Sequence, residues 1–203
     1  MKWNIDMLHD VKSVTKSIVA LTIGAAIKHG YIESVDQSIF DYLPQYRHLK
    51  NEGREAITIE HLVSMTSGLK WDEWGAPLNS TDNDIISLWF PPCDMDPLSC
   101  ILSRPVVDEP GSSFIYCGGN SILLGEIIRN ATHMDLAQFS KKYLFEPMSI
   151  DTVSWPARFK NGVIDGAGGL YLRPRDMLKI GVTMLNDGKW KGTQVISEDW
   201  VRK

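Results

Sequence analysis

Residues 10–30 read DVKSVTKSIVALTIGAAIKHG, and this stretch decides much of the fold. From Ile18 to Ile27 the side chains are apolar on almost every face, which is typical of a helix buried inside a domain. Gly30 follows in the position where helices commonly stop. The sequence therefore predicts a buried helix from Ser13 to His29, with Ser13 at its N-terminal end. The apolar run is too short to span a bilayer.

Ser13 and Lys16 lie three residues apart at the start of this helix, so a hydroxyl and an amine can meet on one face. The positive end of the helix dipole stabilises negative charge that develops near Ser13. Lys16 enters an apolar helix and loses part of its hydration, which favours the neutral amine that can accept a proton. These are the requirements for an activated serine nucleophile.

The same spacing occurs a second time, in Ser67-Gly68-Leu69-Lys70. There a glycine follows the serine at a predicted helix end, so Lys70 need not face Ser67. The spacing alone is therefore weak, and a solvated helix start with Lys12 and Lys16 as surface charges remains open.

Further helices are predicted around the first one. Pro174 suits the first turn of a helix that runs to Leu185, and Leu170 to Leu172 reads as a short strand before it. A long loop is expected from Trp71 to Ser80. The remaining expected helices cover residues 58–65, 82–90, 97–103, 119–131, 135–145 and a short last one capped by Ser197.

Tyr116 ends a short extended piece and is followed by Cys117-Gly118-Gly119-Asn120. From that position its oxygen can project into a cleft and relay the Ser13 proton to a leaving group. A core tyrosine with a hydrogen-bonded hydroxyl is the competing interpretation.

The chain has 203 residues, 43% of them hydrophobic, and a formal net charge of −4. Its basic residues are scattered, so the sequence gives no reason to expect nucleic-acid binding. Cys93, Cys100 and Cys117 form no C-x-x-C pair, and we expect three reduced thiols, although Cys93 and Cys100 could pair across a short loop. No secretory leader is visible, and the localisation stays open.

The five histidines share no metal-binding spacing, and no G-x-S-x-G turn is present. A Ser-His-Asp hydrolase with His61 or His133 as base therefore has little support. The stretch Gly166-Ala167-Gly168-Gly169 lacks the lysine of a phosphate loop and reads as a tight backbone turn.

Several stretches together resemble the serine β-lactamase and penicillin-binding-protein superfamily, in its class C-like branch of β-lactamases, esterases, D-amino-acid peptidases and nylon-oligomer hydrolases. The resemblance covers nearly the whole chain. The stretches that carry it, in order, are residues 10–17, residues 59–69, Glu109-Pro110-Gly111, Phe114-Ile115-Tyr116, Leu123-Leu124-Gly125, Gly168-Gly169-Leu170 and Arg175-Asp176-Met177.

The resemblance implies an acyl-enzyme mechanism. Ser13 would attack an amide, ester or β-lactam carbonyl, Lys16 and Tyr116 would share the base and acid work, and Asn120 and Gly168 would contact the substrate. It implies no metal or cofactor, and a small-molecule acyl substrate as partner. The Tyr-x-x-Gly-Asn arrangement from Tyr116 is similar to the esterase and nylon-oligomer-hydrolase side of the branch.

It also implies an α+β fold of the β-lactamase/transpeptidase type. Because no Lys-Thr-Gly or His-x-Gly strand motif follows Tyr116, we expect residues 1–203 to form a partial domain, mostly helical, with the antiparallel sheet largely missing at both ends. Apolar faces that pack on that sheet would then be exposed and favour self-association. A non-catalytic truncated homologue, acting as an interaction scaffold, remains the alternative function.

Overall fold

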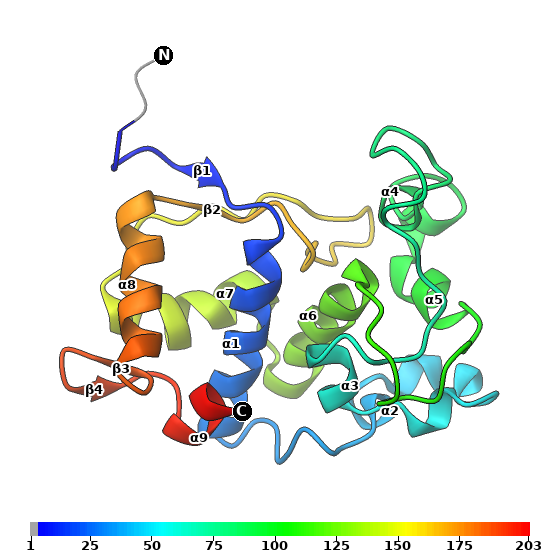
Figure 1. The fold of residues 1–203 in the computed structure, drawn as a ribbon, viewed down its shortest axis with the longest axis horizontal. Coiled ribbons are helices and arrows are strands. Elements are labelled where there is room, and N and C mark those ends of the chain that lie inside the picture. Colours follow the sequence, from blue (N-terminus) through cyan, green and yellow to red (C-terminus); the bar gives the residue numbers. More distant parts are fainter. Residues whose placement is uncertain (1–3) are drawn as a thin grey trace.

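The computed structural model describes residues 4–203, which are mostly helical with two small antiparallel sheets (Figure 1). The α-helices are α1 (Val14–Lys28), α2 (Ile39–Tyr42), α3 (Ile59–Val63), α4 (Asp84–Ser87), α5 (Pro97–Leu102), α6 (Gly118–Thr132), α7 (Leu136–Ser140), α8 (Pro174–Leu185) and α9 (Glu198–Arg202). The strands are β1 (His9–Asp10), β2 (Tyr171–Leu172), β3 (Lys189–Trp190) and β4 (Thr193–Gln194). Short 3-10 or π-helical turns cover Pro44–Leu49, Arg54–Ala56, Cys93–Met95, Lys141–Phe145 and Glu146–Met148.

The buried helix predicted from the sequence is α1, and it packs against α6 and α7 in the core. Its apolar side chains are buried around its circumference, as an interior position requires. Thr22 is tolerated there because its hydroxyl bonds to the Ile18 carbonyl at 2.8 Å and to Ser140 at 2.9 Å. Gly30 adopts a positive φ of 73° just after the helix, which confirms its role in ending α1.

The strand predicted near Leu170 is β2, and it pairs with β1 across one end of α1 (Figure 1). His9 lies opposite Leu172 and Asp10 opposite Tyr171. The ladder continues where the Val11 amide donates to the Leu170 carbonyl at 2.9 Å. This small sheet joins the segment before α1 to the segment before α8, and it fixes the chain where it enters α1.

Two predicted helices are shorter than expected. Only Asp84–Ser87 of the segment 82–90 is α-helical, because Asn83 caps its start and the prolines at 91 and 92 follow it. The segment 135–145 begins as α7 and changes to a π-helical turn at Lys141.

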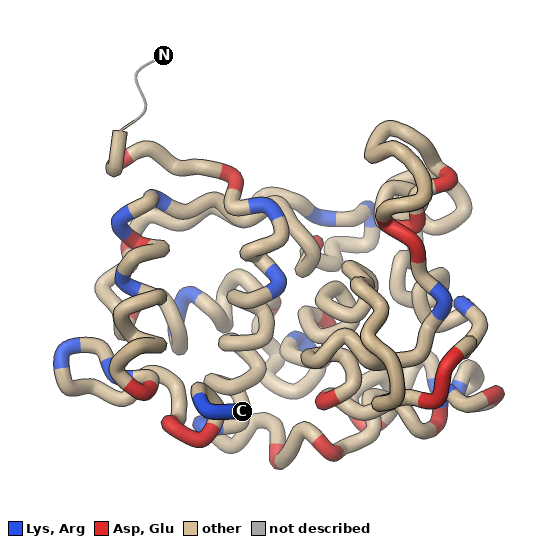
Figure 2. Tube along the Cα trace, in the orientation of Figure 1, with Lys and Arg blue, Asp and Glu red and all other residues tan. Residues whose placement is uncertain are grey.

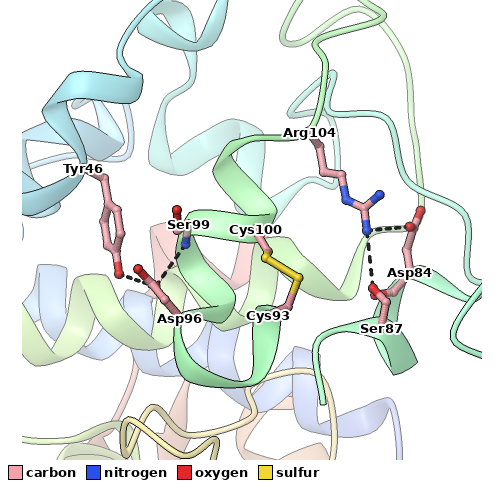
Figure 3. The surroundings of a disulfide bond; sticks show 8 residues. All are labelled: Tyr46, Asp84, Ser87, Cys93, Asp96, Ser99, Cys100 and Arg104. Atoms are coloured by element: carbon pink, nitrogen blue, oxygen red, sulfur yellow. Dashed lines mark hydrogen bonds and ion pairs between the residues drawn. A yellow bond between two sulfur atoms is a disulfide. The ribbon is translucent and has the colours of Figure 1, made fainter. Parts of the chain in front are cut away.

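The expectation of three reduced cysteines was wrong. Cys93 and Cys100 form a disulfide that joins the turn after α4 to α5 (Figure 3). Cys117 is a buried free thiol. A short separation of seven residues and the turn between them bring the two sulfur atoms together, which spacing alone left open.

Lysine and arginine residues and acidic residues are both scattered over the described trace, with no long run of lysine and arginine (Figure 2). Within residues 4–203 no helix is both long and apolar enough to cross a membrane. On α8, three large apolar side chains face solvent, namely Met177, Leu178 and Leu185.

Candidate active site

Ser13 lies at the N-terminal end of α1, directly after a strained residue. Lys12 has a φ of 52°, a left-handed conformation that a residue with a long side chain seldom adopts. Asp10 holds it there, because its carboxylate accepts from the Lys12 amide at 2.9 Å and pairs with the Lys12 amine at 2.6 Å. This turn leaves the Ser13 side chain exposed at the mouth of the helix.

The contact between Asp10 and Lys12 also sets the charge of the turn. Burial alone would raise the pKa of Asp10, but the hydrogen bonds from the Lys12 side chain and amide outweigh it and lower that pKa. The same pair raises the pKa of Lys12. Lys12 is therefore engaged with Asp10.

Lys16 joins three elements of the site. Its amine nitrogen lies 3.2 Å from the Ser13 Oγ, as the helical spacing predicts, and donates to the Ala167 carbonyl at 2.8 Å. The same nitrogen lies over the Tyr116 ring, 4.9 Å from its centroid. The serine, the lysine, the tyrosine and the glycine-rich turn are thus brought together from segments far apart in the sequence.

Tyr116 is placed by the extended segment that precedes α6. The Ile115 amide donates to the Met65 carbonyl at 2.9 Å, and Cys117 is the N-cap residue of α6. The Trp74 ring covers the tyrosine, with centroids 5.6 Å apart. Tyr116 therefore contacts the site through Lys16, and it is not among the residues that line the cavity described next.

Ser13 and Lys16 line an open cavity of about 270 Å³. Its other lining residues fall into a charged and glycine-rich side and an apolar side. The first side is Asp10, Lys12, Glu73, Asp165, Ala167, Gly168 and Gly169, and the second is Leu78, Ile85, Ile86 and Trp89.

Glu73 is a cavity residue that the sequence analysis missed. It is only 9% exposed, and one carboxylate oxygen accepts from the Trp71 indole at 2.7 Å and from the Gly118 amide at 2.5 Å. A Cβ on Gly118 would lie 2.6 Å from that oxygen, so the contact needs a glycine. Glu73 fixes the start of α6, two residues after Tyr116. An acidic residue inside a loop rich in tryptophan carries no spacing that could have revealed this role.

Asp165, also missed, is a second buried carboxylate on the same charged and glycine-rich side. It is 8% exposed and accepts from the Ala167 amide at 2.8 Å, which shapes the turn whose carbonyl binds Lys16. Burial raises the pKa of Asp165, while the hydrogen bond from Ala167 and the charge of Lys16 act in the opposite direction.

The two residues expected to contact a substrate lie in different surroundings. Gly168 lines the same cavity as Ser13. Asn120 is fully buried, and its amide oxygen accepts from the Ser67 hydroxyl at 3.0 Å. In the described structure Asn120 is therefore part of the packing between α6 and the segment at Ser67.

The histidines considered as bases have structural positions. His61 accepts from the Thr58 amide in the cap of α3, and His133 ends α6 in a left-handed conformation. Neither lines the cavity. In the part of the chain that the structure describes, no three His, Cys, Asp or Glu side chains cluster as a metal site would require.

The fold is similar to those of solved β-lactamase-related and penicillin-binding-protein structures. A penicillin-binding protein homologue from Pyrococcus abyssi superposes with a TM-score of 0.72 at 19% identity, over 98% of this chain and 49% of that one. A candidate 6-aminohexanoate-dimer hydrolase from Bacillus anthracis superposes with a TM-score of 0.82 at 20% identity, over 100% of this chain and 54% of that one. The fold is therefore of the β-lactamase and penicillin-binding-protein type, as the sequence indicated.

The sequence comparisons agree. A family model described as Beta-lactamase matches residues 1–202. The chain is also 24% identical over 200 residues to the 6-aminohexanoate-dimer hydrolase of Paenarthrobacter ureafaciens, which covers 97% of this chain and 50% of that protein. The chain belongs to the Beta-lactamase family, and it spans about half the length of the relatives that it matches.

Proposed function

We propose that this chain carries a serine acyl-hydrolase site, with Ser13 as nucleophile. The observation that carries the proposal is the 3.2 Å contact between the Lys16 amine and the Ser13 Oγ at the mouth of a cavity. A nucleophile needs a base within hydrogen-bond reach and a third group that orients the base. Here Ala167 is the third group.

The chemistry follows from these contacts. Lys16, which is oriented by its bond to the Ala167 carbonyl, accepts the Ser13 proton in the proposed reaction. The Ser13 oxygen then bonds to the substrate carbonyl carbon, and the bond to the leaving group breaks. The proton passes from Lys16, with Tyr116 beside it, to the leaving group. Water releases the acyl group and restores the serine proton.

The relatives support a substrate with a reactive carbonyl group, but they do not determine whether it is an amide, an ester or a β-lactam. The 6-aminohexanoate-dimer hydrolase relative is named for a dimer of 6-aminohexanoate. Other proteins of the same fold are a D-stereospecific amidohydrolase from Streptomyces and the hydrolase EstCE1. We propose an amide, ester or β-lactam carbonyl in a small molecule, with Gly168 beside the reacting group.

Labelling with a fluorophosphonate tests the proposal. We expect one adduct per chain, lost in Ser13→Ala and retained in Ser17→Ala, which removes an exposed hydroxyl one turn along the same helix. Circular dichroism of both variants checks that they fold. A folded protein that takes no label would show a non-catalytic homologue and contradict the proposal.

We also infer that residues 1–203 are part of a single hydrolase domain. One buried cluster runs from Val11 to Ile196, and the matched relatives are about twice as long. The exposed apolar side chains on α8 support self-association. Size-exclusion chromatography tests this, because a monodisperse monomer that melts cooperatively would count against it.

A further inference from the structure

The apolar side of the cavity comes from one short segment. Leu78, Ile85, Ile86 and Trp89 all line it, and they belong to the loop before α4, to α4 itself and to the turn after it. We call these four residues the apolar wall. They share the cavity with Ser13, so a group attached to the attacked carbonyl can reach them.

Two members of the apolar wall are unusually exposed for their size. Leu78 is 71% and Trp89 is 36% accessible to solvent, although both border a cavity. Exposed large apolar side chains that line a concave site mark a place where an apolar ligand gains from leaving water.

The wall is held in place before any ligand arrives. The buried Asn83 side chain donates to the Glu73 and Ala76 carbonyls, each at 2.9 Å. Asp84 pairs with Arg104 at 2.8 Å (Figure 3), and the Trp89 ring stacks on Phe159 with centroids 4.3 Å apart.

The disulfide then closes the end of this segment. Cys93 follows the wall by four residues and is bonded to Cys100 on α5 (Figure 3). A surface fixed in this way loses little conformational freedom when a ligand binds, which favours affinity.

The charged side of the cavity already has protein partners. Lys12 pairs with Asp10, Glu73 accepts from Trp71 and Gly118, and Asp165 accepts from Ala167. A polar group that approached the bonded Glu73 or Asp165 oxygen would have to compete with these contacts, whereas an apolar group on the wall displaces no hydrogen bond.

We propose that the apolar wall binds the acyl chain of the substrate, and that this chain is an uncharged aliphatic group. The inference rests on the proposed function, since Ser13 must attack the carbonyl that bears the chain. It adds the substrate class and assigns Leu78, Ile86 and Trp89 as residues that determine specificity.

A series of p-nitrophenyl esters tests the inference, with acetyl, butanoyl, hexanoyl and 6-aminohexanoyl groups. We expect kcat/KM to rise about three- to fourfold for each methylene group that the wall covers. The hexanoyl ester should also react faster than the 6-aminohexanoyl ester. Mass spectrometry of the chain during turnover locates the acyl group on Ser13.

Two variants address the wall itself. Trp89→Ala should lower the ratio of hexanoyl to acetyl kcat/KM about tenfold, a loss of the order expected for a large apolar contact. Because Trp89 also supports Phe159, Leu78→Gln is the second variant, and it should lower the same ratio without disturbing a stacked ring. Leu185→Gln on α8, at 86% exposure, is the control and should leave the ratio unchanged.

The outcomes separate the two proposals. An acyl adduct on Ser13 with a rate independent of chain length would overturn the apolar wall and leave the hydrolase site standing. A preference for the 6-aminohexanoyl ester would also overturn it, in favour of the carboxylates on the charged side. Absence of an adduct with every ester would overturn the proposed function and the inference together.

Discussion

Two segments of this chain share the spacing S-x-x-K and have opposite environments. Ser13 opens a helix of fifteen residues, is exposed to a cavity, and lies 3.2 Å from the Lys16 amine. Ser67 is buried in the irregular segment after α3 and donates to Asn120, while the Lys70 side chain is exposed. The backbone of Ser67 to Lys70 pairs instead with residues 105–107. The comparison shows that the S-x-x-K spacing brings the serine and lysine side chains together only where the four residues lie at the start of a helix.

Replacing the lysine of each motif should give the largest difference in acylation rate between the two motifs. Lys16→Ala deletes the base beside Ser13, and we expect acylation to fall by about 10²- to 10⁴-fold. Lys70→Ala removes an exposed side chain, and its rate should stay within about twofold. The burst of p-nitrophenol from an activated ester measures both. An equal loss of acylation rate in the two variants would contradict the assignment of Lys16 as the base.

The next largest difference is expected in the stability of variants at the second residue of each motif, Gly68 and Val14. Gly68 has a φ of 74°, and a Cβ there would lie 2.1 Å from the Asp108 carbonyl oxygen. Gly68→Ala should therefore lower the free energy of unfolding by at least about 2 kcal/mol. Val14→Ala, on the exposed start of α1, should change it by less than about 1 kcal/mol. Urea unfolding measures both values, and a tolerant Gly68 would contradict the described turn.

Asn120 gives a smaller effect that bears on its expected substrate role. Asn120→Ala leaves the buried Ser67 hydroxyl without its partner, which should cost about 1–3 kcal/mol of stability. We expect KM to stay nearly constant. Steady-state kinetics combined with urea unfolding separate the roles, because a raised KM at unchanged stability would favour direct substrate contact.

Asp165 should give the smallest effect, seen as a change with pH. Its pKa is raised in the folded state by burial, so the folded chain holds this proton more tightly than the unfolded chain. Stability from this group is therefore full below the unfolded value of 3.8 and is lost as pH rises through the folded value. Asp165→Asn should remove this decrease in stability with rising pH, because asparagine does not titrate. Chemical unfolding of both proteins from pH 3 upward checks the sign, and parallel curves would contradict it.

The sequence predicted those parts of the site that depend on local spacing. The contact of Ser13 with Lys16 follows from the helical repeat, and the buried character of α1 follows from its apolar residues. Tyr116 was singled out from its position before a helix and from the family resemblance. Its approach to Lys16 depends on the tertiary packing of α6 against α1.

The parts that the sequence did not predict arise from contacts between distant segments. Glu73 and Asp165 reach the cavity from a loop and a turn that carry no periodic pattern. Cys93 and Cys100 were expected to be reduced, because spacing gives no distance between two sulfur atoms. Asn120 was expected to contact the substrate, and nothing in the sequence indicated its hydrogen bond with Ser67. Each of these depends on how elements pack, which a single sequence does not contain.

Peptide mapping by mass spectrometry after reaction with a fluorophosphonate tests the central claim most directly. The chain contains both serines, so each molecule supplies its own control. A single adduct on the peptide with residue 13, and none on the peptide with residue 67, is the predicted result. An adduct on residue 67, or equal labelling of the two, would show that the helix mouth and its lysine do not activate the nucleophile.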